Sequence, residues 1–322
     1  MNDKIRSALA VLATLLPLVA GAQAAENYPS RTIRLVLPYS PGGPTDVIAR
    51  AVATHMEASL GVTVLVENKP GGQGVISMQS VLLSRPDGYT VGWAPTNVLT
   101  TNRMLIKDLP YKLQDFKLVT TLYRGGMVFA VPKDSPANSL RQFVDLARRE
   151  GKPMIYGTAG PGSGSHLTVE WLAQIERLQT QMIPYKGDSP MSMDVLGGTL
   201  PGMIGTVATT GEQYRRGNLK ILGFTGGTRM EAYPDVPTFK ESGYPIESYF
   251  WAGAVLPAAT PEPIAAKLRA ALHAAMRGSE VKTALTPDIV PIVGGEREYR
   301  DLVDTEYARW SSLIKSRNIA TQ

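Results

Sequence analysis

A strand, a helix and a second strand follow one another between residues 32 and 67, and this unit constrains the fold more than any other feature of the chain. Residues 32–37 form an apolar run, residues 45–60 carry apolar side chains at helical spacing, and residues 62–67 form a second apolar run. Strands joined by a helix lie parallel with a right-handed connection. The pattern therefore predicts a βαβ unit.

The same alternation continues along the chain, and a mature chain of about 300 residues is larger than one core usually supports. Further strands are expected at 89–93, 127–131, 154–156, 182–185, 219–224 and 249–256, and further helices at 75–84, 139–150, 166–178, 189–196 and 298–315. We predict two doubly wound α/β lobes with a hinge and a ligand cleft between them. Residues 26–126 and 250–322 form the first lobe, and residues 127–249 form the second, so two strands cross between the lobes.

The N-terminus is typical of an exported protein. Lys4 and Arg6 precede an apolar run at residues 8–20, and small residues follow at 21–25. This pattern predicts a cleaved signal peptide over residues 1–25 and a periplasmic location, because the run is shorter than the roughly 20 residues of a membrane span. No cysteine occurs, which excludes disulfides and thiolate metal sites.

Several classes of chemistry lack their motifs. His55, His166 and His273 are far apart, so no metal site is expected. The stretch 160–165 fails the G-x-G-x-x-G pattern because Ser165 occupies its last position, and neither a phosphate-binding P-loop nor a nucleophile elbow is present. Basic residues are scattered, without the interleaved aromatics of a nucleic-acid surface. We therefore predict no catalytic residues, no metal, no cofactor and no nucleic-acid partner.

Two glycine-rich loops each lead from a strand into a helix. In the first, residues 38–43, Gly42 and Gly43 allow a ligand close to the backbone, and Tyr39 lies within the loop. Helix N-termini favour anions because their first N–H groups lack internal acceptors. The loop is therefore a candidate half of a carboxylate site.

The second loop, residues 157–165, has the same layout. Its candidate ligand-binding residues are Thr158, Gly162, Ser163, Gly164 and Ser165. The glycines allow tight curvature, and the hydroxyl groups lie beside the start of the following helix. Packing alone could explain either loop, but two such loops at equivalent strand ends favour a shared ligand.

The sequence allows two roles for each of several side chains. Asp46 either stabilises the start of its own helix or holds waters or a ligand donor in the cleft. His166 either donates toward the ligand or makes a structural cap contact. Tyr39, Trp93 and Trp251 are either core residues or walls of the cleft.

The chain resembles the periplasmic substrate-binding proteins of tripartite tricarboxylate transporters, the Bug family. The motifs that carry the resemblance are residues 38–50, 67–72, 86–90, 162–167, 184–187 and 234–238. It implies a type II-like periplasmic binding fold whose two loops hold a ligand carboxylate, with Asp46 in the cleft. It also implies that Asp188 and Asp194 lie near the ligand. Residues 199–201 depart from the family pattern.

The prediction is a monomeric periplasmic receptor, and not an enzyme. It captures a small organic acid and delivers it to the integral-membrane permease subunits of such a transporter. One alternative is a ligand sensor for a signalling partner, and another is an α/β enzyme with Asp46 and His166 as acid and base. The identity of the carboxylate depends on loops such as 94–101 and 205–210.

Overall fold

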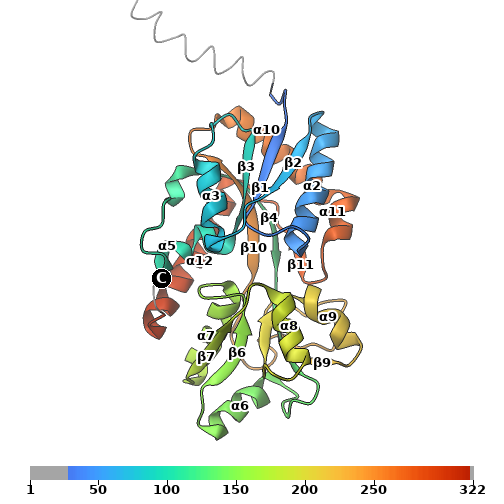
Figure 1. Cartoon of the computed structure of the whole chain (residues 1–322), viewed down its shortest axis with the longest axis vertical. Helices are drawn as coiled ribbons and strands as arrows, with labels where there is room; N and C mark the ends of the chain where they lie inside the picture. The colour runs from blue at the N-terminus through green and yellow to red at the C-terminus, as the bar shows by residue number, and fades with distance from the viewer. Residues whose placement is uncertain (1–27, 320–322) are drawn as a thin grey trace, which may run out of the picture.

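The computed structural model describes residues 28–319, and Figure 1 shows two lobes stacked along the long axis. The predicted signal peptide lies outside the described residues. Within residues 28–319, no helix is long and apolar enough to span a bilayer. Each lobe is a β-sheet flanked by helices, so the prediction of two α/β lobes is confirmed.

The first lobe is built on a six-stranded sheet in the order β11-β4-β10-β3-β1-β2. Its strands are β1 (Ile33–Leu37), β2 (Val64–Asn68), β3 (Thr90–Pro95), β4 (Phe116–Gly125), β10 (Phe250–Pro257) and β11 (Ile289–Pro291). β1 pairs in parallel with β2 and β3, which confirms the predicted βαβ unit. β10 runs antiparallel to β3 and β4, and β11 runs antiparallel to β4. The sheet is therefore mixed, with β10 and β11 running against the other strands.

Helices pack against both faces of this sheet. They are α2 (Pro44–Leu60), α3 (Val75–Leu82), α4 (Thr96–Leu99), α5 (Asn102–Leu105), α10 (Glu262–Arg277), α11 (Ser279–Ala284) and α12 (Glu296–Arg317), with 3-10 turns η1 (Gly72–Gly74) and η2 (Leu113–Asp115). Val52 of α2 and Leu268 of α10 belong to one buried cluster. Val81 of α3 and Val303 of α12 belong to another. Two apolar layers thus enclose the strands.

The second lobe is built on a five-stranded sheet in the order β7-β6-β8-β5-β9. Its strands are β5 (Val128–Pro132), β6 (Met154–Thr158), β7 (Thr180–Pro184), β8 (Met203–Gly205) and β9 (Leu219–Phe224), and its helices are α6 (Leu140–Glu150), α7 (Gly164–Glu176), α8 (Asp188–Leu196) and α9 (Val207–Arg215). β6 is parallel to β7 and β8, but β5 is antiparallel to β8 and β9. This sheet is also mixed.

The chain passes between the lobes from β4 to β5 and again before β10. The fully buried Thr225 joins these two segments, because its Oγ1 accepts from Met127 N at 2.8 Å and donates to Ser248 O at 2.7 Å. The assignment of strands to the two sheets supports the division that we propose, with residues 26–126 and 250–322 in one lobe and 127–249 in the other.

Local sequence signals set the helix starts. Pro44 occupies the first turn of α2, where its missing N–H costs no hydrogen bond, and the extended Gly43 precedes it. Ser139 is the N-cap of α6, as predicted, and accepts a hydrogen bond from Gln142 N at 3.2 Å. The short strand β8 and helix α9 were not predicted, because neither is long enough to show a clear period.

Candidate ligand site

The first loop keeps open space above its glycines. Gly42 has a φ of +87°, a conformation that favours glycine, and Gly43 is extended with a φ of −79°. A Cβ atom at either position would meet nothing within 4 Å. The backbone at the start of α2 is therefore accessible to a ligand, and the helix dipole there favours an anion.

Asp46 holds this loop in shape. Its carboxylate accepts hydrogen bonds from Gly42 N at 3.0 Å and from Asn68 Nδ2 at 2.9 Å. Arg50 donates two more, at 2.8 Å from Nε and 3.1 Å from Nη2. The bonds from Arg50 are the main cause that lowers the pKa of Asp46 to about 2, so the carboxylate is ionised at neutral pH. With only 3% of its surface exposed, Asp46 is better suited to positioning the loop than to contacting a ligand.

The second loop is held by three hydroxyl groups. Thr158 Oγ1 lies 2.6 Å from Ser165 Oγ and 3.0 Å from Ser163 Oγ, and the two serine oxygens are 2.9 Å apart. Ser163 is also the N-cap of α7. Gly160, with a φ of +111°, leaves open space where a Cβ would be. The two loops are therefore alike: in each, side-chain hydrogen bonds hold the turn, and a glycine before the helix leaves open space beside the backbone.

Gly162 lies where the second loop meets the first lobe. Its carbonyl oxygen accepts from Thr101 Oγ1 at 2.9 Å, and a Cβ at Gly162 would lie 2.4 Å from Leu105 Cδ1. Its N–H donates to His166 Nδ1 at 3.0 Å. Burial is the main cause that lowers the pKa of His166, so the ring is neutral and accepts this bond. The sequence left His166 either as a donor to the ligand or as a structural cap, and this contact favours the cap. Gly164 begins α7.

Tyr39 of the first loop lies close enough to Asp188 of the second lobe for the two groups to affect each other's titration. Desolvation raises the pKa of the Tyr39 phenol, and Tyr123 and Asp188 raise it further, although 40% of the residue's surface remains exposed. Asp188 begins α8 and accepts hydrogen bonds from the N–H and Oγ1 of Thr206, each at 2.7 Å. Burial raises the pKa of Asp188. These groups form a polar boundary between the first loop and the start of α9.

Other predicted residues lie apart from this boundary. Asp194 is exposed, and its Oδ2 accepts a hydrogen bond from the Tyr185 hydroxyl at 2.6 Å. Trp93 and Trp251 are buried, with 0% and 2% exposed, so they are core residues and not walls of a cleft.

Two residues at the lobe boundary were missed by the sequence analysis. Tyr123, near the end of β4, lies with its hydroxyl 3.4 Å from Thr45 Oγ1. Asp288 is 4% exposed, and within residues 28–319 neither of its carboxylate oxygens makes a hydrogen bond of regular geometry. Burial is the main cause that raises its pKa, while the Val207 N–H lies close enough to oppose the shift. No local pattern marks either residue, because their neighbours come from distant segments.

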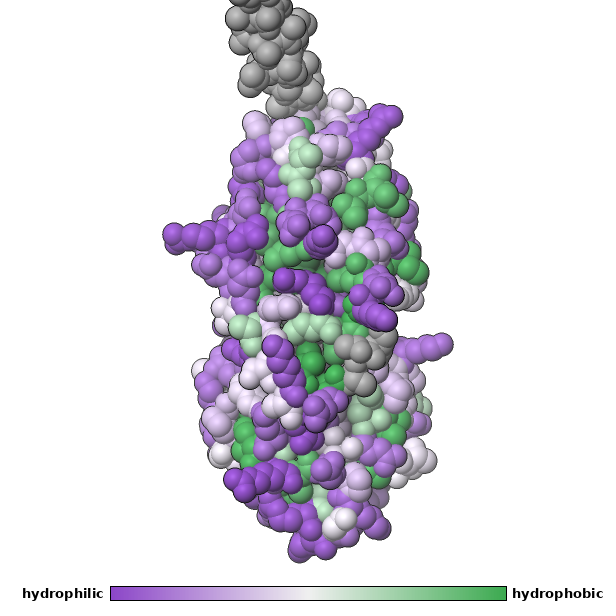
Figure 2. Space-filling view, turned by 90° about the vertical axis from the view of Figure 1, so that its left-hand side faces the viewer, coloured by the Kyte–Doolittle hydropathy of each residue, from purple (hydrophilic) through white to green (hydrophobic). Residues whose placement is uncertain are grey.

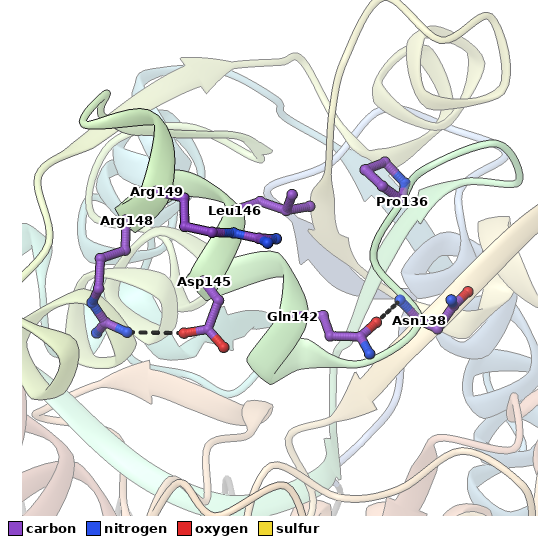
Figure 3. Close-up of a pocket in the computed structure, with 7 residues that line it drawn as sticks. All are labelled: Pro136, Asn138, Gln142, Asp145, Leu146, Arg148 and Arg149. Atoms are coloured by element: carbon purple, nitrogen blue, oxygen red, sulfur yellow. Dashed lines mark hydrogen bonds and ion pairs between the residues drawn. The ribbon is translucent and has the colours of Figure 1, made fainter.

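Two surface hollows are lined by residues outside the glycine loops. One of about 520 Å³ lies along α6, and Figure 3 shows its lining residues. They are Pro136, Asn138, Gln142, Asp145, Leu146, Arg148 and Arg149. Arg148 is already paired with Asp145 and Glu176, so its charge is not free for an anion. Across residues 28–319, no group of three or more histidine and acidic side chains is arranged to hold a metal ion.

The sequence and the fold are similar to those of known binding proteins. A family model described as tripartite tricarboxylate transporter family receptor matches residues 48–319. Protein BugT of Bordetella pertussis is 29% identical over 301 residues, which covers 92% of each chain. The structure of periplasmic binding protein BugD superimposes with a TM-score of 0.81 at 29% identity, over 92% of this chain and all of BugD.

Two similar structures contain dicarboxylates. Rpa4515 of R. palustris with adipate has a TM-score of 0.83 at 27% identity and covers 92% of this chain and 100% of its own. MatC of Rhodopseudomonas palustris with bound malate has a TM-score of 0.79 at 28% identity and covers 89% of this chain and 100% of its own. The matching family is one of receptors and the similar structures include a periplasmic binding protein, so the enzyme alternative is wrong. The chain therefore belongs to the tripartite tricarboxylate transporter family of receptors, as its motifs indicated.

Proposed function

We propose that the protein is a periplasmic receptor that captures a small organic carboxylate between its two glycine-rich loops. The observation that carries this proposal is the open space above Gly42, Gly43 and Gly160, at the starts of two helices in different lobes. Exposed backbone N–H groups and helix dipoles bind a carboxylate without a buried lysine or arginine. The adipate and malate in the two similar structures support the same ligand class.

The proposed ligand-binding residues come from both lobes. The first loop supplies Tyr39, Gly42 and Gly43, with Asp46 as the residue that shapes it. The second lobe supplies Thr158, Gly162, Ser163, Gly164, Ser165 and His166 from its loop, and Asp188 from the start of α8. We do not assign Asp194 to the site, because it is exposed and bonded to Tyr185.

Capture leads to transport in this proposal. A ligand that contacts both lobes stabilises the closed arrangement, and the changed surface is recognised by the permease subunits. The predicted signal peptide at residues 1–25 accounts for export to the periplasm. The receptor acts as a monomer, since each chain contains both loops.

Titration calorimetry with a panel of mono- and dicarboxylates, including malate and adipate, tests the capture step. We expect at least one carboxylate to bind with one-to-one stoichiometry. Failure of the folded protein to bind any acid of a broad panel would contradict the proposal. Uptake of the same acid, labelled, by cells with and without the receptor gene tests delivery, and equal uptake would favour the sensor alternative.

A further inference from the structure

Helix α12 crosses the junction between the two lobes. Its first half packs into the core of the first lobe through Tyr299 and Val303, whereas Trp310 lies in a separate cluster with Leu167 of α7. The rings of Trp310 and Trp171 meet edge to face, with centroids 6.2 Å apart. Figure 1 shows α12 passing beside α5 and ending near α7, and Figure 2 faces this side of the molecule, with apolar side chains visible where the lobes meet.

The last turn of α12 places a cation against a buried acid of the second lobe. Arg317 Nε donates to Glu170 Oε2 at 2.9 Å, and its Nη1 donates to Leu178 O at 3.2 Å. The side chains of Arg317 and Glu170 are 17% and 7% exposed. The Tyr156 hydroxyl donates to Glu170 Oε1 at 3.2 Å, and Thr180 Oγ1 donates to the same oxygen. Among residues 28–319, Arg317 is the one arginine or lysine paired with Glu170, and a buried carboxylate with a single cation partner depends on that cation.

Glu170 also faces the histidine that shapes the second loop. Its Oε1 lies 4.0 Å from His166 Nε2, one helical turn away. The other ring nitrogen, Nδ1, accepts the hydrogen bond from Gly162 N, so the ring proton of the neutral form is on Nε2, facing Glu170. The titratable groups around His166 are Glu170 in its own helix, Arg317 from α12 and the Tyr156 hydroxyl from β6.

We propose that Arg317 is a positioning residue for the second ligand loop. Its charge compensates Glu170, which would otherwise draw a proton onto His166. A doubly protonated ring cannot accept a hydrogen bond, so it would release the Gly162 N–H. Arg317, at the end of α12, thus preserves the hydrogen bond that holds Gly162 in the conformation proposed to bind the ligand. The inference rests on the proposed function, because it assumes that this loop holds the carboxylate.

Titration of His166 tests the first step without any ligand. The ¹⁵N signals of the imidazole rings are followed by NMR from pH 5 to pH 8, and the His166→Gln variant identifies the signal among the three histidines. We expect the pKa of His166 to be below 6.5 in the wild type and to rise clearly in Arg317→Gln. Arg317→Lys should restore the low value, because lysine keeps the positive charge.

Ligand affinity tests the second step. With malate or adipate, whichever the wild type binds more tightly, Arg317→Gln should lose about tenfold or more in affinity at pH 6 and much less at pH 8. The loss follows protonation of His166, which is small at pH 8. Arg309→Gln is a matched control, because Arg309 lies on the same helix and pairs with the buried Glu306, and within residues 28–319 no ion pair or hydrogen bond joins it to Glu170 or His166.

The double variant Arg317→Gln/Glu170→Gln covers the case in which Arg317→Gln fails to fold. It removes the unpaired charge, and the pKa of His166 should return below 6.5. The proposal would be overturned if the pKa of His166 stayed unchanged in Arg317→Gln. It would also be overturned if the pKa of His166 stayed raised in the double variant. An affinity loss that is the same at pH 6 and pH 8 would overturn it too. Failure of the wild type to bind any carboxylate would instead contradict the proposed function. The His166 titration needs no ligand, so it would still test the role of Arg317.

Discussion

Asp46→Asn should destabilise the protein by about 1–3 kcal/mol at pH 7. The substitution removes the charge that Arg50 neutralises and places an NH₂ group where two acceptor oxygens now serve Gly42 and Asn68. At least one of these donors then lacks its acceptor. The effect should appear as a lower midpoint in urea denaturation, followed by circular dichroism.

The electrostatic part of this loss can be worked from the pKa. In the folded protein the pKa of Asp46 is lowered from 3.8 to about 2, which corresponds to about 2.5 kcal/mol at about 1.4 kcal/mol per pH unit. Because 51% of the Arg50 side chain is exposed, solvent screening reduces this to about 1–2 kcal/mol. A lowered folded pKa stabilises the protein above pH 4, and this stabilisation is lost as the pH falls toward 2.

The difference between wild type and Asp46→Asn should therefore shrink between pH 7 and pH 3. Asp87→Asn is the control, because Asp87 pairs with Arg31 at 2.8 Å on the surface, where 57% of the Arg31 side chain is exposed. An exposed pair of this kind contributes about 0.2–1 kcal/mol. The reasoning is refuted by a stability difference that stays constant with pH, or by a loss at pH 7 no larger than that of the control.

Two further substitutions probe the glycines. Gly43→Val should weaken carboxylate binding at least tenfold in calorimetry, because the new side chain fills the open space before α2. The free energy of unfolding should change by less than about 1 kcal/mol, because the side chain meets no neighbour. Unchanged affinity would contradict the proposed site. Gly253→Ala should cost at least about 2 kcal/mol in urea denaturation, because its Cβ would lie 2.3 Å from Tyr299 Cζ. Gly164→Ala, whose Cβ would meet only Met127 at 3.9 Å, is the control for stability, and equal losses would show that the contact at Gly253 relaxes freely.

The sequence determined the local parts of the site. Both strand-to-helix loops were predicted at residues 38–43 and 157–165, because glycine, proline and capping residues act on their immediate neighbours. The start of α6 at Ser139 followed from the same chemistry. The two-lobe α/β class also followed from the sequence, since alternating strands and helices leave few ways to bury their apolar faces.

Only the tertiary structure decided how the site is assembled. The antiparallel insertion of β10 between β3 and β4 joins strands far apart in the chain, and no local period specifies such pairing. The partners of Asp46 and Glu170 include Asn68 and Arg317, which lie 22 and 147 positions away. Sequence therefore supplied the loops, whereas the charges and contacts that hold them in shape depend on long-range packing that brings distant segments together.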